Sequence, residues 1–112
     1  MNRWQGIISF LLIVVVMFGF SPIAIADELS PGAYLFEVHC AGCHINGGNI
    51  IRRGKNLRQK ALEKNGYGSV EAIAQIVTNG KNNMSAYGDR LTPEQIQAVS
   101  SYVLEQAQQG WK

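Results

Sequence analysis

The sequence predicts an all-α domain of about four short helices. Apolar residues recur at helical spacing, a capping residue precedes most helical segments, and no stretch alternates apolar and polar residues as a strand would. No internal repeat is present, so the helices belong to one domain. The long Gly- and Asn-rich connections between them suit loops that wrap a flat ligand better than a bundle that packs only on itself.

The first half of the domain is predicted to hold two helices. One runs from about residue 31 to the turn at residues 40–44, with Ser30 as its N-cap and a proline directly after it. Residues 45–55 are predicted to be a loop, because two glycines flanked by asparagines cannot hold a helix. Residues 56–65 then form a short amphipathic helix that ends before a glycine.

The second half is predicted to hold two more helices. Ser69 caps the third, and Asn79-Gly80 ends it with residues that tolerate positive φ. Residues 81–91 form a loop. The segment Thr92-Pro93-Glu94-Gln95 is a capping box that opens the last helix, which Gly110 stops.

The first 26 residues are predicted to be a signal peptide. Arg3 gives a positive start, residues 10–18 are an unbroken apolar run, and Ala24-Ile25-Ala26 provides the small residues that a signal peptidase selects. The alternative is an uncleaved anchor, because residues 6–26 are long enough to span a bilayer. The expected domain is therefore residues 27–112, exported and soluble after cleavage.

Residues 27–112 are nearly neutral in charge. They hold nine Lys and Arg, the total of ten less Arg3, and all eight Asp and Glu. This balance gives no basis for binding nucleic acid or an acidic membrane, both of which require a concentrated basic patch. A domain this short buries only about 60% of its unfolded surface, so it is marginally stable unless a cofactor adds to its core.

The motif Cys40-Ala41-Gly42-Cys43-His44 predicts such a cofactor, a covalently attached c-type haem. Two intervening residues place the sulfurs about one helical turn apart, which matches the two vinyl groups of a haem, and His44 can then bind the iron. The alternatives are a disulfide, a redox dithiol and a zinc site. A dithiol enzyme needs a βαβ setting that is missing, and four zinc ligands drawn from residues 39–44 would converge with strain.

Met84 is the predicted second ligand of the iron. It is the only methionine in residues 27–112 and lies in a polar loop, whereas a methionine that fills a core usually lies on a helical stripe. His39 precedes Cys40 on the same side of the ring and cannot reach across it. Since both iron positions would be filled and no nucleophile or general base stands beside them, the sequence predicts an electron carrier rather than an enzyme.

With these residues placed, residues 29–111 resemble the cytochrome c6 family, also called soluble cytochrome c-553. The resemblance implies a small class I cytochrome c fold, all-α, with about four helices wrapped around one covalent haem c. It also implies that the first and last helices cross at Gly32 and Phe36, with Tyr102 as an aromatic partner. The matching blocks are Gly32-x-x-x-Phe36, Lys60-Ala61-Leu62-Glu63-Lys64, Ser69-Val70-Glu71-Ala72-Ile73, Val77-Thr78-Asn79-Gly80-Lys81-Asn82, Tyr102-Val103-Leu104 and Gly110-Trp111.

The resemblance also implies partners and further site residues. The electron donor would be the cytochrome b6f complex and the acceptor photosystem I or a respiratory oxidase, with a monomeric carrier in the thylakoid lumen or the periplasm. Asn49 and Lys55 would lie near the haem propionates, and Arg90 would help docking on photosystem I near the exposed haem edge. The alternative for each of the three is an ordinary solvated charge or turn-forming residue.

Two positions depart from the family pattern. Ser85 follows the ligand methionine where the family usually has proline, which predicts a looser loop without lost ligation. Ile76 stands where the family usually has glutamine, and Gln75 is about 100° away around the helix. Relatives with an aliphatic residue there are associated with lower potentials, so we expect a lower-potential c6-like paralogue. The alternatives are a haem sensor that binds a gas when Met84 dissociates, and a membrane-tethered carrier.

Overall fold

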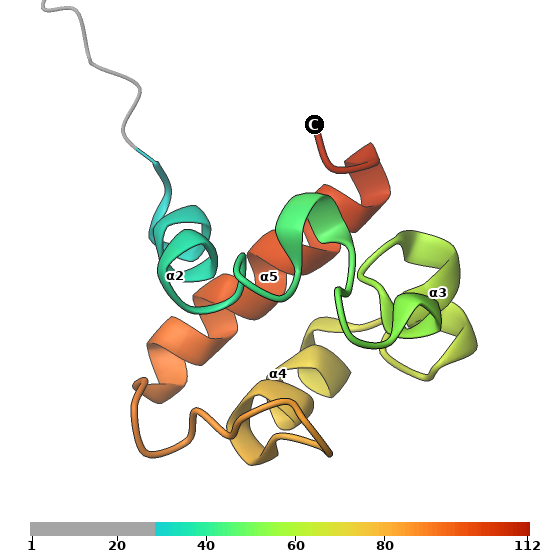
Figure 1. Cartoon of the computed structure of the whole chain (residues 1–112). Helices are drawn as coiled ribbons and strands as arrows, with labels where there is room; N and C mark the ends of the chain where they lie inside the picture. Colours follow the sequence, from blue (N-terminus) through green and yellow to red (C-terminus); the bar gives the residue numbers. More distant parts are fainter. Residues whose placement is uncertain (1–28) are drawn as a thin grey trace, which may run out of the picture.

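The computed structural model describes residues 29–112 (Figure 1). The predicted signal peptide, its cleavage point and the alternative anchor lie outside these residues. The described part contains four α-helices, and none of them is long and apolar enough to cross a membrane. They are α2 (Pro31–His39), α3 (Gln59–Lys64), α4 (Val70–Asn79) and α5 (Pro93–Gln109), with two short 3₁₀ turns, η1 (Ile45–Gly47) and η2 (Arg53–Lys55). Residues 29–112 contain no strand, which confirms the all-α prediction.

The long helix α5 runs through the middle of the molecule, and α2 and α4 pack against it (Figure 1). α2 crosses α5 at Gly32, where a Cβ atom would collide with the carbonyl oxygen of Ala98 and come within 2.8 Å of the Cβ of Tyr102. One turn later, the Phe36 ring lies 5.5 Å from that of Tyr102 and 5.0 Å from that of Trp111, centroid to centroid. These contacts confirm the predicted crossing.

The predicted helix caps are present. Ser30 Oγ accepts a hydrogen bond from the Ala33 N–H and Ser69 Oγ accepts one from the Ala72 N–H, each at 3.2 Å. At the start of α5, Thr92 and Gln95 exchange side-chain to backbone bonds of 3.1 and 2.9 Å, which complete the capping box. α4 ends at Gly80 and α5 at Gly110, both with positive φ.

The predicted start of the second helix, at residue 56, is wrong by three residues. Asn56 Oδ1 accepts the Arg58 N–H at 3.0 Å, and the Leu57 N–H is directed away to the Gly47 carbonyl at 2.7 Å. These bonds hold residues 56–58 in an extended turn, so α3 begins only at Gln59. The predicted loop before it contains η1 and η2.

The core lies where α2, α3 and α4 meet α5. The apolar residues at helical spacing in α5 are buried at Ile96, Val99, Val103 and Ala107, and Tyr102 is half-buried. Ser100 is also fully buried, which the apolar pattern did not predict. The buried apolar residues are Leu35, Phe36, Leu62, Ile73, Val77, Leu91, Ile96, Val99, Val103 and Ala107.

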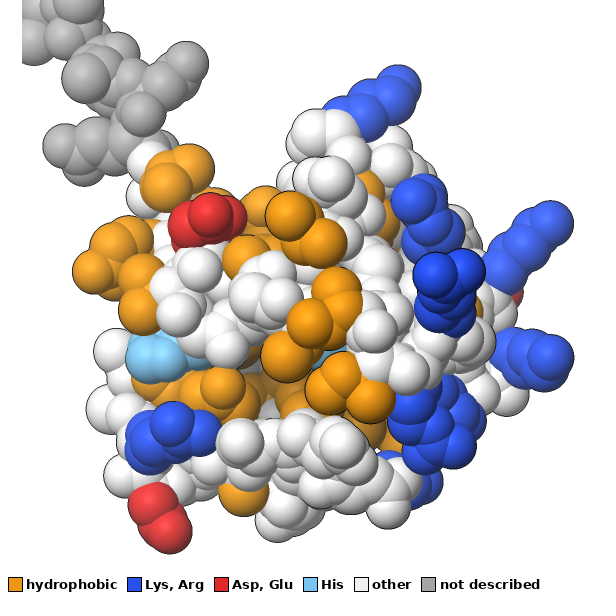
Figure 2. Space-filling view, viewed as in Figure 1, with side chains coloured by type: hydrophobic (Ala, Val, Ile, Leu, Met, Phe, Trp, Pro, Cys, Tyr) orange, Lys and Arg blue, Asp and Glu red, His pale blue; other side chains and the backbone are white. Residues whose placement is uncertain are grey.

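The surface divides by side-chain type. Figure 2 shows apolar side chains around a hollow in the face toward the viewer and Lys and Arg side chains on the side that α3 occupies. Residues 52–64 hold six Lys and Arg but only one Glu, so a nearly neutral total conceals a basic segment. The large apolar side chains with high exposure are Leu29, Tyr34, Val38, Ile45, Ile50 and Ile51.

Candidate cofactor site

The hollow opens into a cavity of about 440 Å³. All four residues predicted to hold the cofactor, Cys40, Cys43, His44 and Met84, line this cavity. They come from two stretches separated by 40 residues, the turn after α2 and the loop after α4. The apolar part of its wall is formed by Phe36, Ile51, Leu57, Ala61, Leu62, Ile73, Ile76, Val77, Val99 and Val103.

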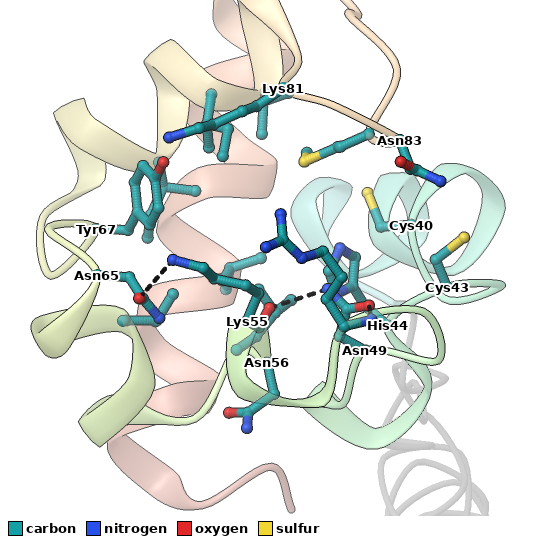
Figure 3. Close-up of a pocket in the computed structure, with 18 of the residues that line it drawn as sticks. Cys40, Cys43, His44, Asn49, Lys55, Asn56, Asn65, Tyr67, Lys81 and Asn83 are labelled. Carbon is teal, nitrogen blue, oxygen red and sulfur yellow. Dashed lines mark hydrogen bonds between the residues drawn. The ribbon is translucent and has the colours of Figure 1, made fainter.

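Cys40 and Cys43 lie side by side at one end of the cavity (Figure 3). Cys40 caps the C-terminus of α2, and its carbonyl accepts the N–H groups of Cys43 and His44 at 3.2 and 3.0 Å, which folds the motif into a tight turn. Both side chains are free thiols. Burial raises the pKa of the Cys40 thiol to about 11, so this thiol is uncharged at neutral pH.

His44 is oriented by the chain that follows it. Its Nδ1 lies 2.8 Å from the carbonyl oxygen of Gly48. A carbonyl only accepts, so this contact assigns the proton to Nδ1 and leaves the lone pair on Nε2 available for a metal. The motif at residues 40–44 does not by itself identify Gly48 as this partner.

The last residues of the chain support the same loop. Gly47 has positive φ, and a side chain there would overlap the indole ring of Trp111. Trp111 Nε1 donates to the Leu57 carbonyl at 3.0 Å, and the Leu57 N–H in turn donates to the Gly47 carbonyl. Trp111 therefore packs against the loop that holds the His44 ring.

Met84 is half-buried in a closed turn. Its backbone and that of Lys81 exchange hydrogen bonds of 3.0 and 2.9 Å, and Asn82 between them has φ of 53°. Figure 3 shows Lys81 and Asn83, two residues of this turn, across the cavity from His44. Ser85 is exposed. The loop thus has its own backbone closure in the absence of the family's proline.

Asn49 and Lys55 both line the cavity, but their side chains are already hydrogen-bonded. Asn49 Oδ1 accepts the N–H groups of Ile51 and Arg52 at 3.0 and 2.8 Å, and its Nδ2 donates to the Lys55 carbonyl at 3.1 Å. Lys55 Nζ donates to Asn65 Oδ1 at 2.7 Å, drawn as a dashed line in Figure 3. Asn49 therefore shapes the loop over residues 49–55.

Arg90 does not line the cavity, but one residue links it to the wall. Its guanidinium lies 4.2 Å from the ring centroid of Tyr87, which does line the cavity. Tyr87 Oη donates to the His39 carbonyl at 2.9 Å, and the two rings meet edge to face. The turn at Cys40 and the segment that carries Arg90 are joined by this contact.

Ile76 and Gln75, neighbours on α4, differ in whether they reach the cavity. Ile76 is half-buried and lines the cavity, whereas Gln75 is exposed and does not. This agrees with the helical geometry, in which neighbouring residues point about 100° apart. An aliphatic side chain therefore contacts the ligand space at this point.

Sequence reasoning missed several polar residues of the cavity wall. Arg52 and Lys81 belong to it, together with Tyr67 and Asn65. The signal that could have found Arg52 is the basic run Arg52-Arg53-Gly54-Lys55, which begins eight residues after His44. The other residues meet only through the fold.

The residues present fit a haem. The cavity is apolar, a pair of thiols closes one end, and a histidine and a methionine reach it from separate segments. Thiols add to vinyl groups, and nitrogen and thioether sulfur are the axial donors of low-spin haem iron in cytochromes c. The apolar wall would exclude water from the ring.

Comparison with protein families agrees with this fit. Residues 27–103 match a family profile described as "Cytochrome C oxidase, cbb3-type, subunit III". A "Cytochrome c6-like" protein of Nostoc sp. (strain PCC 7120) is 59% identical over 109 residues, which cover 93% of this chain and 98% of that protein. A "Cytochrome c6" of Thermosynechococcus vestitus is 45% identical over 98 residues, which cover 88% of each chain.

A solved structure shows the same fold. The crystal structure of cytochrome c6C from Synechococcus sp. PCC 7002 superposes with a TM-score of 0.72 at 68% sequence identity. The match covers 73% of this chain and all of that one.

Proposed function

This chain belongs to the cytochrome c6 family, and from that premise we propose that it carries single electrons on a haem held by Cys40, Cys43, His44 and Met84. It is an electron-transfer protein rather than an enzyme, and its cofactor is one covalent haem c. The observation that carries the residue assignment is that two thiols, His44 and Met84 line a single apolar cavity.

Each residue has a distinct role in this proposal. Cys40 and Cys43 form thioethers, in which sulfur and its proton add across the vinyl groups. His44 offers Nε2 to the iron while the Gly48 carbonyl holds its Nδ1 proton. Met84 would offer its sulfur from the loop after α4, and thioether sulfur favours Fe(II) and raises the potential. The haem, when bound, supplies the one-electron couple of its iron, and with both His44 and Met84 engaged other ligands would be excluded.

Spectroscopy of the purified holoprotein tests the assignment. A pyridine haemochrome spectrum of a haem with two thioethers, together with the near-red band of a methionine-ligated ferric haem, is the expected result. Met84→Ala should lose that band and bind carbon monoxide when reduced, whereas the control Ser85→Ala should keep the band. A wild-type protein without the near-red band would reject Met84 as ligand.

We propose that the protein acts as an exported, soluble monomer in the thylakoid lumen or the periplasm, with residues 1–26 removed. The proposed donor is the cytochrome b6f complex, and the proposed acceptor is photosystem I or a respiratory oxidase. Exposed Arg90 supports docking near the cavity, because its guanidinium lies over the ring of Tyr87, a residue of the cavity wall. Arg90→Gln should slow flash-induced reduction of photosystem I at low salt, and Arg53→Gln, which removes the same charge elsewhere, should slow it less.

The same comparisons support a lower-potential paralogue. Identity is 59% to a c6-like protein and 68% to cytochrome c6C, against 41–53% to several cytochromes c6, and Ile76 places an aliphatic side chain at the cavity. A redox titration should give a midpoint below that of the main photosynthetic carrier. An equal midpoint would reject the paralogue hypothesis.

A haem sensor with a labile Met84 is the second candidate, and exposed Ser85 in place of proline is the observation that favours it. The bonds between Lys81 and Met84 favour the carrier instead, because they restrain the ligand loop. Ready binding of carbon monoxide to the reduced wild-type protein would decide for the sensor.

A further inference from the structure

The cavity wall carries positive charge that no carboxylate balances. Arg52, Lys55 and Lys81 line it, and no Asp or Glu of residues 29–112 does. All three side chains are exposed, so water solvates them and an anion can reach them. The wall therefore suits a ligand that is apolar over most of its area and anionic on one side.

Two of these three charges lie on the side of the cavity away from the thiols. Figure 3 shows the ammonium groups of Lys55 and Lys81 on the side of Asn65 and Tyr67, with Cys40 and Cys43 on the other side. A haem has its two propionates on the opposite side of the ring from the vinyl groups. If Cys40 and Cys43 hold the vinyl edges, the propionates point toward the lysines.

Two of the three cations are free to bind these carboxylates. Lys55 Nζ is engaged by Asn65, at 2.7 Å. Within residues 29–112 the side chains of Arg52 and Lys81 have no hydrogen-bond or ion-pair partner. The Arg52 backbone is held by Asn49 Oδ1 at 2.8 Å, so this residue is fixed at the cavity while its guanidinium stays available.

We propose that Arg52 and Lys81 form the carboxylate-binding end of the cavity and pair with the haem propionates. The planar fork of an arginine bonds a carboxylate through two parallel N–H groups, whereas a lysine acts as a point charge. This proposal rests on the proposed function for the haem itself. Its consequence is that the propionates stay ionised to lower pH than solvated ones would, because a neighbouring cation favours the charged carboxylate.

The test is the pH dependence of the midpoint potential in Arg52→Met holoprotein. Loss of the cation raises the propionate pKa, so the pH-dependent step of the potential should move to higher pH, at a proton concentration about tenfold lower. The potential itself should fall, because a nearby cation disfavours Fe(III) over Fe(II). Arg52→Lys should recover most of the wild-type curve.

Arg53→Met is the matched control. Arg53 is exposed and is not part of the cavity wall, so its loss removes the same charge from the next residue while leaving the proposed contact in place. In Arg53→Met the pH-dependent step of the midpoint potential should move much less than in Arg52→Met. Equal curves for both variants, whether shifted or unshifted, would overturn a direct role for Arg52.

Lys81→Met provides an independent arm if the Arg52 variant fails to fold. This variant should shift the pH-dependent step of the midpoint potential in the same direction and keep the near-red band of Met84. An unchanged dependence of the potential on pH would remove Lys81 from the proposal. Haem content is measured first on every sample. A wild-type chain without covalent haem rejects the proposed function, whereas normal haem content with an unchanged Arg52→Met curve rejects only the propionate site.

Discussion

The backbones of Lys81 and Met84 exchange two hydrogen bonds, of 3.0 and 2.9 Å, and so close the loop that carries the proposed iron ligand. The next segment is bonded to α4, with the Tyr87 N–H on the Val77 carbonyl and the Gly88 N–H on the Thr78 carbonyl, at 2.9 and 3.1 Å. A methionine on such a loop is restrained on both sides. These backbone hydrogen bonds thus restrict the conformation of the Met84 loop, as a proline after the methionine would in other members of the family.

Gly80 should be essential to this loop. It has φ of 68°, and a Cβ atom there would come within 2.6 Å of the Met84 carbonyl oxygen and 2.7 Å of the Ala86 nitrogen. Gly80→Ala should lower the free energy of unfolding by about 1–3 kcal/mol and weaken the near-red methionine band. Thermal unfolding and absorbance of the holoprotein measure the two effects.

Gly66→Ala is the control for Gly80. Gly66 also has positive φ, of 83°, but a Cβ atom there meets nothing within 4 Å. It should lose about 1 kcal/mol from backbone strain alone and keep the near-red band. Loss of that band in the Gly66 variant would contradict a local role for Gly80.

Gly32 should control the spacing of α2 and α5. Gly32→Ala introduces a methyl group against the Ala98 carbonyl and 2.8 Å from the Tyr102 Cβ, both parts of a helix that cannot yield easily. We expect a loss of about 1–3 kcal/mol, or roughly 4–8 °C in Tm for each kcal/mol. Gly54→Ala, whose Cβ meets nothing within 4 Å, should leave the Tm nearly unchanged.

Ser100 is predicted to weaken the core. Its side chain is 0% exposed, and its Oγ has no hydrogen-bond partner among the described residues. Ser100→Ala should raise the free energy of unfolding by about 1 kcal/mol, because the desolvated hydroxyl is removed. Ser101 is half-buried on the same helix. Ser101→Ala is therefore the control that measures the helix propensity of alanine without removing a fully buried hydroxyl. If denaturant titrations show the same increase in the free energy of unfolding for both variants, burial of the hydroxyl is not the cause.

Ile76→Gln should raise the midpoint potential. An amide at the cavity can donate a hydrogen bond that favours the extra electron of Fe(II), and a bond of ~1 kcal/mol corresponds to about 40 mV for a one-electron couple. Gln75→Ile, at an exposed position outside the cavity wall, should leave the potential unchanged. A potential that falls in the Ile76 variant would show that polarity, not hydrogen bonding, dominates there.

Elements whose causes are local could be predicted from the amino-acid sequence. Ser30, Ser69 and Thr92 cap their helices through bonds that reach three residues along the chain, so spacing alone reveals them. The Cys40–His44 motif is equally local. The start of α3 was mispredicted because the Leu57 N–H bonds to Gly47, ten residues away, a competitor that periodicity does not show.

Which distant residues meet is evident only in the folded molecule. Trp111 lies against Gly47 and bonds to Leu57, and Arg52 and Lys81 come to one cavity although 29 residues separate them. The fold also places the Ser100 hydroxyl in the core, on a turn of α5 that a binary pattern treats as polar. The physical reason is that these contacts depend on how helices pack around the cavity, and packing is a property of pairs of elements rather than of any one segment.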